Sequence, residues 1–270
     1  MNIFKYDFPK IMGILNVTPD SFSDGGLYFT TEKAVYHSLA MIEKGVDIID
    51  IGGESTRPGA DPVPTEEELK RVIPVIKGII FVNKNVKISI DTQKYEVAEA
   101  AVDAGANMIN DVSGLDNDIR IAELAARHNL ELILMHKKGT PKTMQNNPEY
   151  NDVVEDVFNE LKNKIGLAKD FGVQKVIADV GIGFGKTVEH NLKLLKNLNK
   201  FTELGVPLLV GISRKSFIGK ILEIENPQER DYATAIIHTL MLTFKLDIIR
   251  VHNVDLIIQL KKIYNAFKNL

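Results

Sequence analysis

Polar and charged side chains recur in this sequence immediately after short apolar runs. They are Asn16, the run 52–57 (Gly-Gly-Glu-Ser-Thr-Arg), Asp91, Asn110 and Asp111, His136, Asp179, the run 213–215 (Ser-Arg-Lys), Arg250 and His252. Carboxylates and amides accept hydrogen bonds from a ligand, and cations attract anions, so together these residues suit a polar binding site. Any one of the Asp, Asn or Ser residues could instead cap a helix that follows a strand. Their repetition after nearly every apolar run predicts one shared pocket.

Two segments have the pattern of an anion-binding site. The run Ser213-Arg-Lys-Ser216 joins an apolar run to a helical stretch, and free N–H groups at a helix start attract anions. Ser216 could be only a helix cap, but the adjacent Lys215 favours the binding interpretation. Arg250 and His252 are two residues apart, so they project from one face of a strand. A buried arginine there requires a carboxylate or an anionic ligand such as phosphate.

The glycine-rich run 181–187 (Gly-Ile-Gly-Phe-Gly-Lys-Thr) invites comparison with two nucleotide-binding motifs and matches neither. A Walker A loop would need glycine at Val180, and a dinucleotide-binding turn would need glycine at Lys186. We therefore expect these glycines to let the backbone approach a flat ligand beside Asp179.

Two loops, 18–26 and 53–64, carry Pro, Ser and Gly next to possible ligand contacts. Phe22 is a large apolar residue in a segment that could hardly bury it permanently, and Pro62 and Pro64 stiffen the second loop. An ordinary crossover would also account for the first loop. The two loops together predict lids that exclude water from a reaction site.

The elements that position these residues follow from the periodicity. Apolar, β-branched runs alternate with helical stretches. The expected strands are 11–17, 48–53, 87–92, 108–113, 131–136, 175–181, 207–213 and 248–252, and the expected helices are 31–44, 65–80, 95–104, 118–129, 152–171, 188–198, 231–245 and 254–267. A doubly wound open sheet would show the same alternation, but eight units favour an α/β fold with one closed (β/α)8 TIM barrel over residues 1–270. The polar residues then lie at the C-terminal ends of the strands, where active sites of this fold form.

The composition excludes several classes of function. The 270 residues include no cysteine, which rules out thiolate nucleophiles, cysteine-ligated zinc and disulfides. The net charge of −3, without a Lys/Arg block, gives a nucleic-acid partner little support. Residues 1–10 lack the apolar core of a signal peptide, and no apolar run approaches the ~20 residues that span a bilayer. We therefore expect a cytoplasmic protein with no nucleic-acid or membrane partner.

Beyond these separate motifs, the chain resembles the dihydropteroate synthases from about residue 11 to residue 254. The segments that carry the resemblance are 11–26, 50–60, 89–94, 109–114, 134–141, 181–186 and 211–219. Seven matches in the same order are far more specific than any single motif. The resemblance implies a barrel enzyme of folate biosynthesis that condenses (7,8-dihydropterin-6-yl)methyl diphosphate with 4-aminobenzoate. It also implies sensitivity to sulfonamides through the 4-aminobenzoate site.

The resemblance implies a role for particular residues. The implied pterin-binding residues are Asp91, Asn110, Asp179, Lys215, Met135 and Phe184. The implied diphosphate-binding residues are Asn16, Arg250, His252 and Thr56, with Mg²⁺ as cofactor and Asn16 as its protein ligand. The implied 4-aminobenzoate-binding residues are Ser216, Phe22, Pro58, Arg57, Thr56 and Phe184, completed by Asp24. Arg250, His252, Lys215 and Asn16 are the expected catalytic residues.

Leaving-group chemistry predicts the mechanism. Diphosphate held by Mg²⁺ and cationic side chains is a good leaving group, and a pterin spreads positive charge from its exocyclic methylene. We therefore expect an SN1-like step followed by attack of the neutral arylamine. No strong general base is needed, in agreement with motifs that contain no obvious Ser–His or His–carboxylate pair. Electrostatic stabilisation and positioning would supply most of the catalysis.

Three residues depart from the family pattern. Val180 replaces the usual Pro, which is expected to loosen the turn beside Asp179. Asn253 replaces the usual Asp and removes a negative charge next to the expected anion site, and Lys137 replaces a common Met and is expected to be solvated.

Two alternatives stay open at this point. A pterin-dependent methyltransferase would share the barrel and the pterin contacts, but would not need the 213–216 anion site or Arg250 facing a diphosphate. A catalytically silent homologue is supported only by Val180 and Asn253. The family also implies a homodimer, for which the last helices offer an apolar stripe of Ile236, Ile237, Leu240, Ile257 and Leu260. Such a stripe is more often the helix face packed on the barrel.

Overall fold

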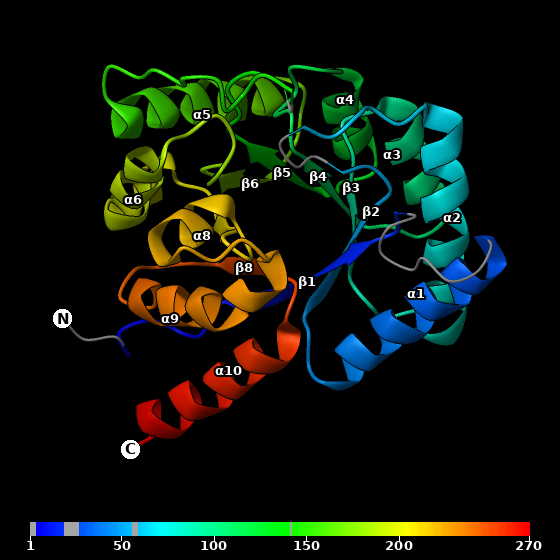
Figure 1. The fold of residues 1–270 in the computed structure, drawn as a ribbon. Coiled ribbons are helices and arrows are strands. Elements are labelled where there is room, and N and C mark those ends of the chain that lie inside the picture. Colours follow the sequence, from blue (N-terminus) through cyan, green and yellow to red (C-terminus); the bar gives the residue numbers. More distant parts are fainter. Residues whose placement is uncertain (1–3, 19–26, 56–58, 141) are drawn as a thin grey trace.

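A computed structural model describes residues 4–18, 27–55, 59–140 and 142–270. Eight parallel strands close into a barrel in chain order, β1 to β8, with the helices outside it (Figure 1). The strands are β1 Lys10–Asn16, β2 Ile48–Gly52, β3 Ile88–Asp91, β4 Met108–Asp111, β5 Glu131–Met135, β6 Lys175–Asp179, β7 Leu208–Val210 and β8 Ile248–Val251. The predicted (β/α)8 barrel is confirmed.

The helices follow the predicted alternation except after β6 and β7, where additional short helices appear. They are α1 Leu27–Glu43, α2 Thr65–Val82, α3 Tyr95–Asp103, α4 Arg120–Arg127, α5 Val153–Asp170, α6 Val188–Lys196, α7 Leu198–Phe201, α8 Ser216–Leu222, α9 Asp231–Met241 and α10 Val254–Lys268, with 3-10 turns η2 Thr202–Leu204 and η3 Pro227–Arg230. A left-handed Glu223 closes α8, and Pro227 opens η3. Among the described residues, no helix combines the length and apolar character needed to cross a bilayer.

Strand alternation sorts the side chains into two sets. One apolar layer fills the barrel interior and consists of Met12, Ile48, Met108, Ile133, Ile177, Leu209 and Ile248. A larger cluster packs between the strands and the helices. Residues two positions beyond the inner layer point to the same side, because successive strand side chains alternate. Asp50, Asn110, Asp179 and Arg250 therefore lie inside the barrel, near the C-terminal ends of the strands, which we call the mouth.

The last helices divide the predicted apolar stripe. Ile257 is only 1% exposed and belongs to the core, and Ile237 and Leu260 pack against that core. Ile236 and Leu240 are 61% and 67% exposed on α9. The interpretation of the stripe as a helix face packed on the barrel is therefore confirmed for Ile237, Ile257 and Leu260, whereas Ile236 and Leu240 face outwards.

The segment before β1 is fastened to α10. The Tyr264 hydroxyl and Lys268 Nζ both donate to the carbonyl of Tyr6, at 2.6 and 2.8 Å. The ring of Phe8 packs edge-on against Tyr264, with centroids 5.4 Å apart. Because this segment leads into β1 and α10 returns from β8, both lie near the end of the barrel opposite the mouth (Figure 1).

Candidate active site

Arg250 joins two carboxylates inside the mouth. Its Nε donates to Asp50 Oδ2 and its Nη2 to Asp91 Oδ2, both at 2.6 Å. Asn110 Nδ2 also donates to Asp50 Oδ2, at 3.1 Å. The sequence predicted a carboxylate or an anionic ligand for Arg250, and in this structure carboxylates take that place.

Asp50 is a member of this cluster that sequence reasoning missed. It is fully buried, and its Oδ1 has no hydrogen-bond partner among the described residues. A buried carboxylate oxygen without a partner is costly unless a ligand or a proton satisfies it. The signal was present, since Asp50 follows the inward Ile48 by two residues.

Two acids of the mouth, Asp91 and Asp179, have raised pKa values chiefly because they are buried. Burial raises the pKa of Asp91 to about 7; Arg250 opposes the shift, and Asp50 and Glu68 add to it. Burial also raises the pKa of Asp179, against a hydrogen bond from Gly181 N to its Oδ1 at 2.8 Å. Both carboxyls therefore gain from a ligand that brings hydrogen-bond donors.

Lys215 closes one side of the same space. Its Nζ lies 3.9 Å from the centroid of the Phe184 ring, a cation–π contact. Its charge lowers the pKa of both Asp91 and Asp179, so it lies within electrostatic range of both. Met135 is buried, two residues beyond the inner Ile133. All six residues predicted for pterin binding thus line or border the inside of the mouth.

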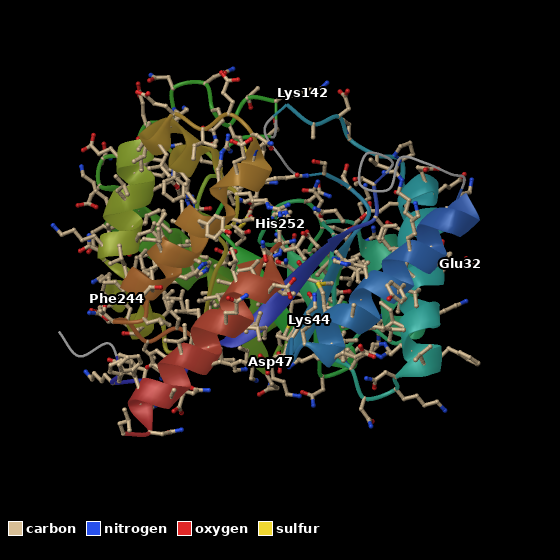
Figure 2. The ribbon with its side chains drawn as sticks, turned by 60° about the horizontal axis from the view of Figure 1, so that its bottom comes forward. Glu32, Lys44, Asp47, Lys142, Phe244 and His252 are labelled. Carbon is tan, nitrogen blue, oxygen red and sulfur yellow. The ribbon has the colours of Figure 1, made fainter. Side chains whose placement is uncertain are left out.

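His252 and Asn16 lie at the ends of β8 and β1. The His252 backbone N donates to Ser213 Oγ at 3.1 Å, and its Nδ1 lies 3.0 Å from the same oxygen. Figure 2 shows His252 towards the middle of the molecule, whereas Glu32, Lys142 and Phe244 lie at the periphery. Asn16 is half-buried at the end of β1, and its register partner is Gly52.

Arg214 and Asn253 both bind the same acid, Asp231. Arg214 pairs with Asp231 through Nε and Nη2, at 2.7 and 2.8 Å, and Asn253 Nδ2 donates to Asp231 Oδ2 at 3.0 Å. The Asn253 Oδ1 accepts from Leu256 N at 3.3 Å and caps α10. The amide at position 253 is therefore occupied by a neighbouring acid and by the helix.

Ser216 is exposed as the first residue of α8, and the helix has no side-chain capping bond. The alternative in which Ser216 serves only as a cap is therefore not supported. The other predicted contacts to 4-aminobenzoate and diphosphate, Phe22, Asp24, Thr56, Arg57 and Pro58, lie outside the described residues.

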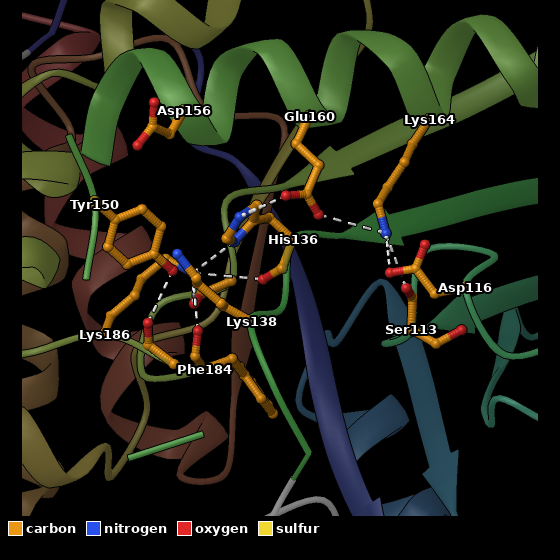
Figure 3. A network of polar contacts seen from close by, with 12 residues as sticks. Ser113, Asp116, His136, Lys138, Tyr150, Asp156, Glu160, Lys164, Phe184 and Lys186 are labelled. Atoms are coloured by element: carbon orange, nitrogen blue, oxygen red, sulfur yellow. Dashed lines mark hydrogen bonds and ion pairs between the residues drawn. The ribbon is translucent and has the colours of Figure 1, made fainter. Parts of the chain in front are cut away.

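Two residues predicted to share this pocket face the other way. Asp111 accepts hydrogen bonds from Ser113 N, Ser113 Oγ and Leu115 N, at 2.8, 2.7 and 2.7 Å. His136 is buried between Lys186 and Glu160, with its Nδ1 2.9 Å from Lys186 Nζ and its Nε2 3.2 Å from Glu160 Oε2 (Figure 3). Each follows an inward residue by one position, so the prediction of a shared pocket was wrong for both.

Val180 and Lys137 are the other two residues that depart from the family pattern. Val180 is fully buried in the outer core, and the Gly181–Asp179 hydrogen bond holds the turn that a proline would have stiffened. Lys137 was expected to be solvated, but it is half-buried and its Nζ donates to Gln93 Oε1 at 3.4 Å. Burial lowers the pKa of Lys137.

The Glu54 of the run 52–57 has a structural partner. Lys94 Nζ donates to Glu54 Oε2 at 3.0 Å, to Glu68 Oε2 at 2.5 Å and to the Val63 carbonyl at 2.8 Å. Val63 N donates in turn to Glu54 Oε1 at 2.7 Å. These bonds tie both ends of the 53–64 loop to α2 and to the end of β3.

The oxygen ligands available at the mouth indicate how Mg²⁺ could be bound there. Among the described residues, no group of three or more His, Asp or Glu side chains could hold a metal ion by itself. Asn16 offers one neutral amide oxygen at the mouth. Mg²⁺ typically takes one or two protein oxygens and completes its shell with substrate phosphates and water. The residues present therefore fit an ion that arrives with a diphosphate.

Comparison with known proteins gives one consistent result. The family model described as "Pterin binding enzyme" matches residues 12–252. A dihydropteroate synthase of Synechocystis sp. is 45% identical over 258 residues, which cover 95% of this chain and 89% of the relative.

Two solved structures from Xanthomonas albilineans agree. A dihydropteroate synthase with 4-aminobenzoic acid has a TM-score of 0.90 and 42% identity, covering 98% of this chain and 94% of the other. A complex with 7,8-dihydropteroate has a TM-score of 0.87 and 39% identity, covering 100% and 96%.

Proposed function

The chain belongs to the pterin binding enzyme family as a dihydropteroate synthase, and we propose that its mouth divides the work between a buried pterin pocket and an outer rim. The reaction joins (7,8-dihydropterin-6-yl)methyl diphosphate to 4-aminobenzoate, giving 7,8-dihydropteroate and diphosphate. The methyltransferase and the silent homologue have no support among these relatives.

In the pterin pocket, Asp179 and Asp91 accept from the amino group and ring N–H of the pterin. A carboxylate can accept two neighbouring donors, which suits this edge. Asn110 lies beside them through its bond to Asp50, and Lys215 donates to the acceptor side of the ring. Met135 and Phe184 bound the ring on its apolar faces.

The diphosphate lies on the outer side of this pocket, at Asn16, Arg250, His252 and Thr56. Arg250 bonds to both Asp50 and Asp91, and it becomes able to bind the diphosphate when a donor of the pterin replaces it at Asp91. Mg²⁺, when bound through Asn16, would neutralise part of the charge that develops on the leaving diphosphate.

The 4-aminobenzoate carboxylate lies at exposed Ser216, where the first turn of α8 begins. Its ring meets Phe184 and the Lys215 stem, and Phe22, Pro58, Arg57, Thr56 and Asp24 complete the site.

The bond between the pterin methylene and the diphosphate oxygen breaks first, and the pterin ring carries the positive charge. The neutral arylamine nitrogen then attacks the methylene and loses a proton to solvent. The chain contributes by holding two substrates in line and by placing Arg250 and His252 at the leaving group.

The observation that carries this proposal is the buried acid cluster of the mouth, which Arg250 only partly neutralises. The test is an assay of diphosphate release from the pterin ester with Mg²⁺, with and without 4-aminobenzoate. Release that depends on 4-aminobenzoate and yields dihydropteroate is the expected result. Pterin binding without release would overturn the proposal.

A cytoplasmic location and a homodimer stay predictions. For the homodimer we propose a contact through α9, where Tyr232, Ile236 and Leu240 recur every four residues and are at least 61% exposed. Such a row of large apolar side chains is typical of an interface. Sedimentation analysis of Leu240→Glu should show a shift from dimer to monomer, and a monomeric parent chain would contradict the prediction.

A further inference from the structure

Lys186 is an almost fully buried lysine that contacts none of the carboxylates assigned to the pterin edge, and burial lowers its pKa to about 7. It is 2% exposed and follows directly after the 181–185 turn. Its Nζ donates to the carbonyls of Gly181 and Phe184, at 2.8 and 3.1 Å, and lies 2.9 Å from His136 Nδ1. One ammonium thus spans both ends of the turn and the end of β5.

The histidine partner has a defined tautomer. Because Nδ1 faces the Lys186 donor, the ring proton lies on Nε2 and is donated to Glu160 Oε2 at 3.2 Å. Burial lowers the pKa of His136, the charge of Lys186 lowers it further, and Glu160 opposes both effects. Beyond Glu160, Lys164 continues the chain of contacts to Asp116 at 2.6 Å (Figure 3).

The backbone conformation of the 181–185 turn requires glycine at particular positions. Gly181 and Gly185 have φ of 67° and 64°, and a Cβ on Gly181 would lie 1.8 Å from the His136 carbonyl oxygen. Two more side chains complete the attachment: Gln145 Nε2 donates to Gly183 O at 2.7 Å, and the Tyr150 hydroxyl donates to Gly185 O at 2.8 Å. Side chains thus bond four carbonyls of the turn, those of Gly181, Gly183, Phe184 and Gly185, and hold a backbone that a Gly-rich sequence alone would leave flexible.

The 181–185 turn contacts or contains two residues assigned to substrate binding, Asp179 and Phe184. The N–H of Gly181 donates to Asp179 Oδ1, and the ring of Phe184 lies against Lys215. A turn that shifts therefore moves the carboxylate for the pterin edge and the ring between the two substrates.

We propose that Lys186 is a positioning residue of the pterin pocket, which fixes the 181–185 turn and thereby the geometry of Asp179 and Phe184 without touching either substrate. The inference rests on the proposed function, because it takes Asp179 and Phe184 as substrate contacts. A substrate contact by Lys186 itself is not needed, since its donors are directed to the turn and to His136.

The test compares two buried lysines of the same chain of contacts. Lys186→Met keeps an unbranched side chain, one atom shorter, and removes its donors, so the KM for the pterin ester should rise about 30-fold while kcat falls less than about threefold. Lys164→Met removes a lysine that is also buried, at 7% exposed, but is bonded to Ser113 O and Asp116, away from the turn. It should lower the melting temperature and leave this KM unchanged. Lys186→Arg, which restores donors, should recover part of the lost affinity.

A milder variant covers the case in which Lys186→Met does not fold. Tyr150→Phe removes one hydrogen bond to the same turn and should raise the KM about threefold. An unchanged KM in Tyr150→Phe, an unchanged KM in folded Lys186→Met, or equal KM rises in Lys186→Met and Lys164→Met would overturn the inference.

Equilibrium binding separates this inference from the proposed function. The fluorescence of 7,8-dihydropterin titrated with each protein reports the pocket without turnover. If the parent chain binds it, releases no diphosphate, and loses affinity in Lys186→Met, the proposed function fails and the positioning role stands. If the parent chain turns over and Lys186→Met binds dihydropterin as tightly as the parent, only the positioning role fails.

Discussion

The inward and outward sides of the same strand ends use similar residues in different ways. On the outward side, Asp111 accepts three hydrogen bonds, and His136 has a partner on each ring nitrogen. On the inward side, Asp50 has an oxygen without a partner among the described residues. Burial raises the pKa of inward Asp91 and of outward Asp111 alike, so the difference lies in the hydrogen bonds. The outward groups complete one another and hold the backbone. The inward groups are left for a ligand to complete.

Replacing Arg250 should have the largest effect on this contrast. Arg250→Ala removes the cation that Asp50 and Asp91 share, and truncating one partner of a buried charge pair costs about 4 kcal/mol. We expect kcat/KM for the pterin ester to fall about 1,000-fold. Steady-state kinetics beside the exposed Arg120→Ala measures this. Unchanged kinetics would remove Arg250 from the diphosphate site.

Matched changes at Asp179 and Asp111 should separate affinity from stability. Asp179→Asn removes the carboxylate from the pterin edge and should weaken dihydropterin binding about 100-fold, with little loss of stability. Asp111→Asn keeps one acceptor oxygen and replaces the other with an NH2 donor, so at least one of the three hydrogen bonds is lost. The free energy of unfolding should fall by about 2 kcal/mol, with binding nearly unchanged. Titration calorimetry and urea unfolding measure the two quantities. Equal effects of both changes on binding would contradict the division into two sides.

Because the pKa of Asp91 is raised, we expect a rise in pH to lower the stability of the fold and to increase the affinity for pterin. Its acid form is favoured in the folded chain, so its contribution to stability is present below the unfolded pKa and is lost as pH rises through about 7. Pterin binding needs the carboxylate, so affinity should increase about tenfold from about pH 6 to about pH 8. Asp179, whose pKa is also raised, acts in the same direction. Dihydropterin titrations at several pH values test this, and the Asp91→Asn profile should be flatter than that of the parent.

The smallest effect is expected at Asn253. Asn253→Asp restores the residue usual in the family and keeps the cap of α10, but it replaces a donor to Asp231 with a like charge. The free energy of unfolding should fall by about 0.5 kcal/mol, with kcat/KM unchanged. Asn226→Asp at an exposed cap is the control, measured by the same urea curves. A gain in activity would restore a role for this position at the anion site.

The sequence predicts the barrel more completely than it predicts the contacts within the inward site. Strand positions and the polar residues after them were predictable, because both follow from periodicity along one segment. Partners were not. Arg250 meets Asp91 across 159 residues, and Lys186 meets His136 across 50, and no local pattern encodes such distances. The placement of Asp111 and His136 failed for a simpler reason, since polar residues were grouped by strand end and not by the side they face.

The fastening of residues 6–8 to α10 has a consequence for how this barrel can be joined to other proteins. A polypeptide attached ahead of Tyr6 or beyond Lys268 would leave the barrel on the side opposite its substrates. Tags, reporter domains or a second enzyme fused at either end should therefore leave substrate entry unobstructed.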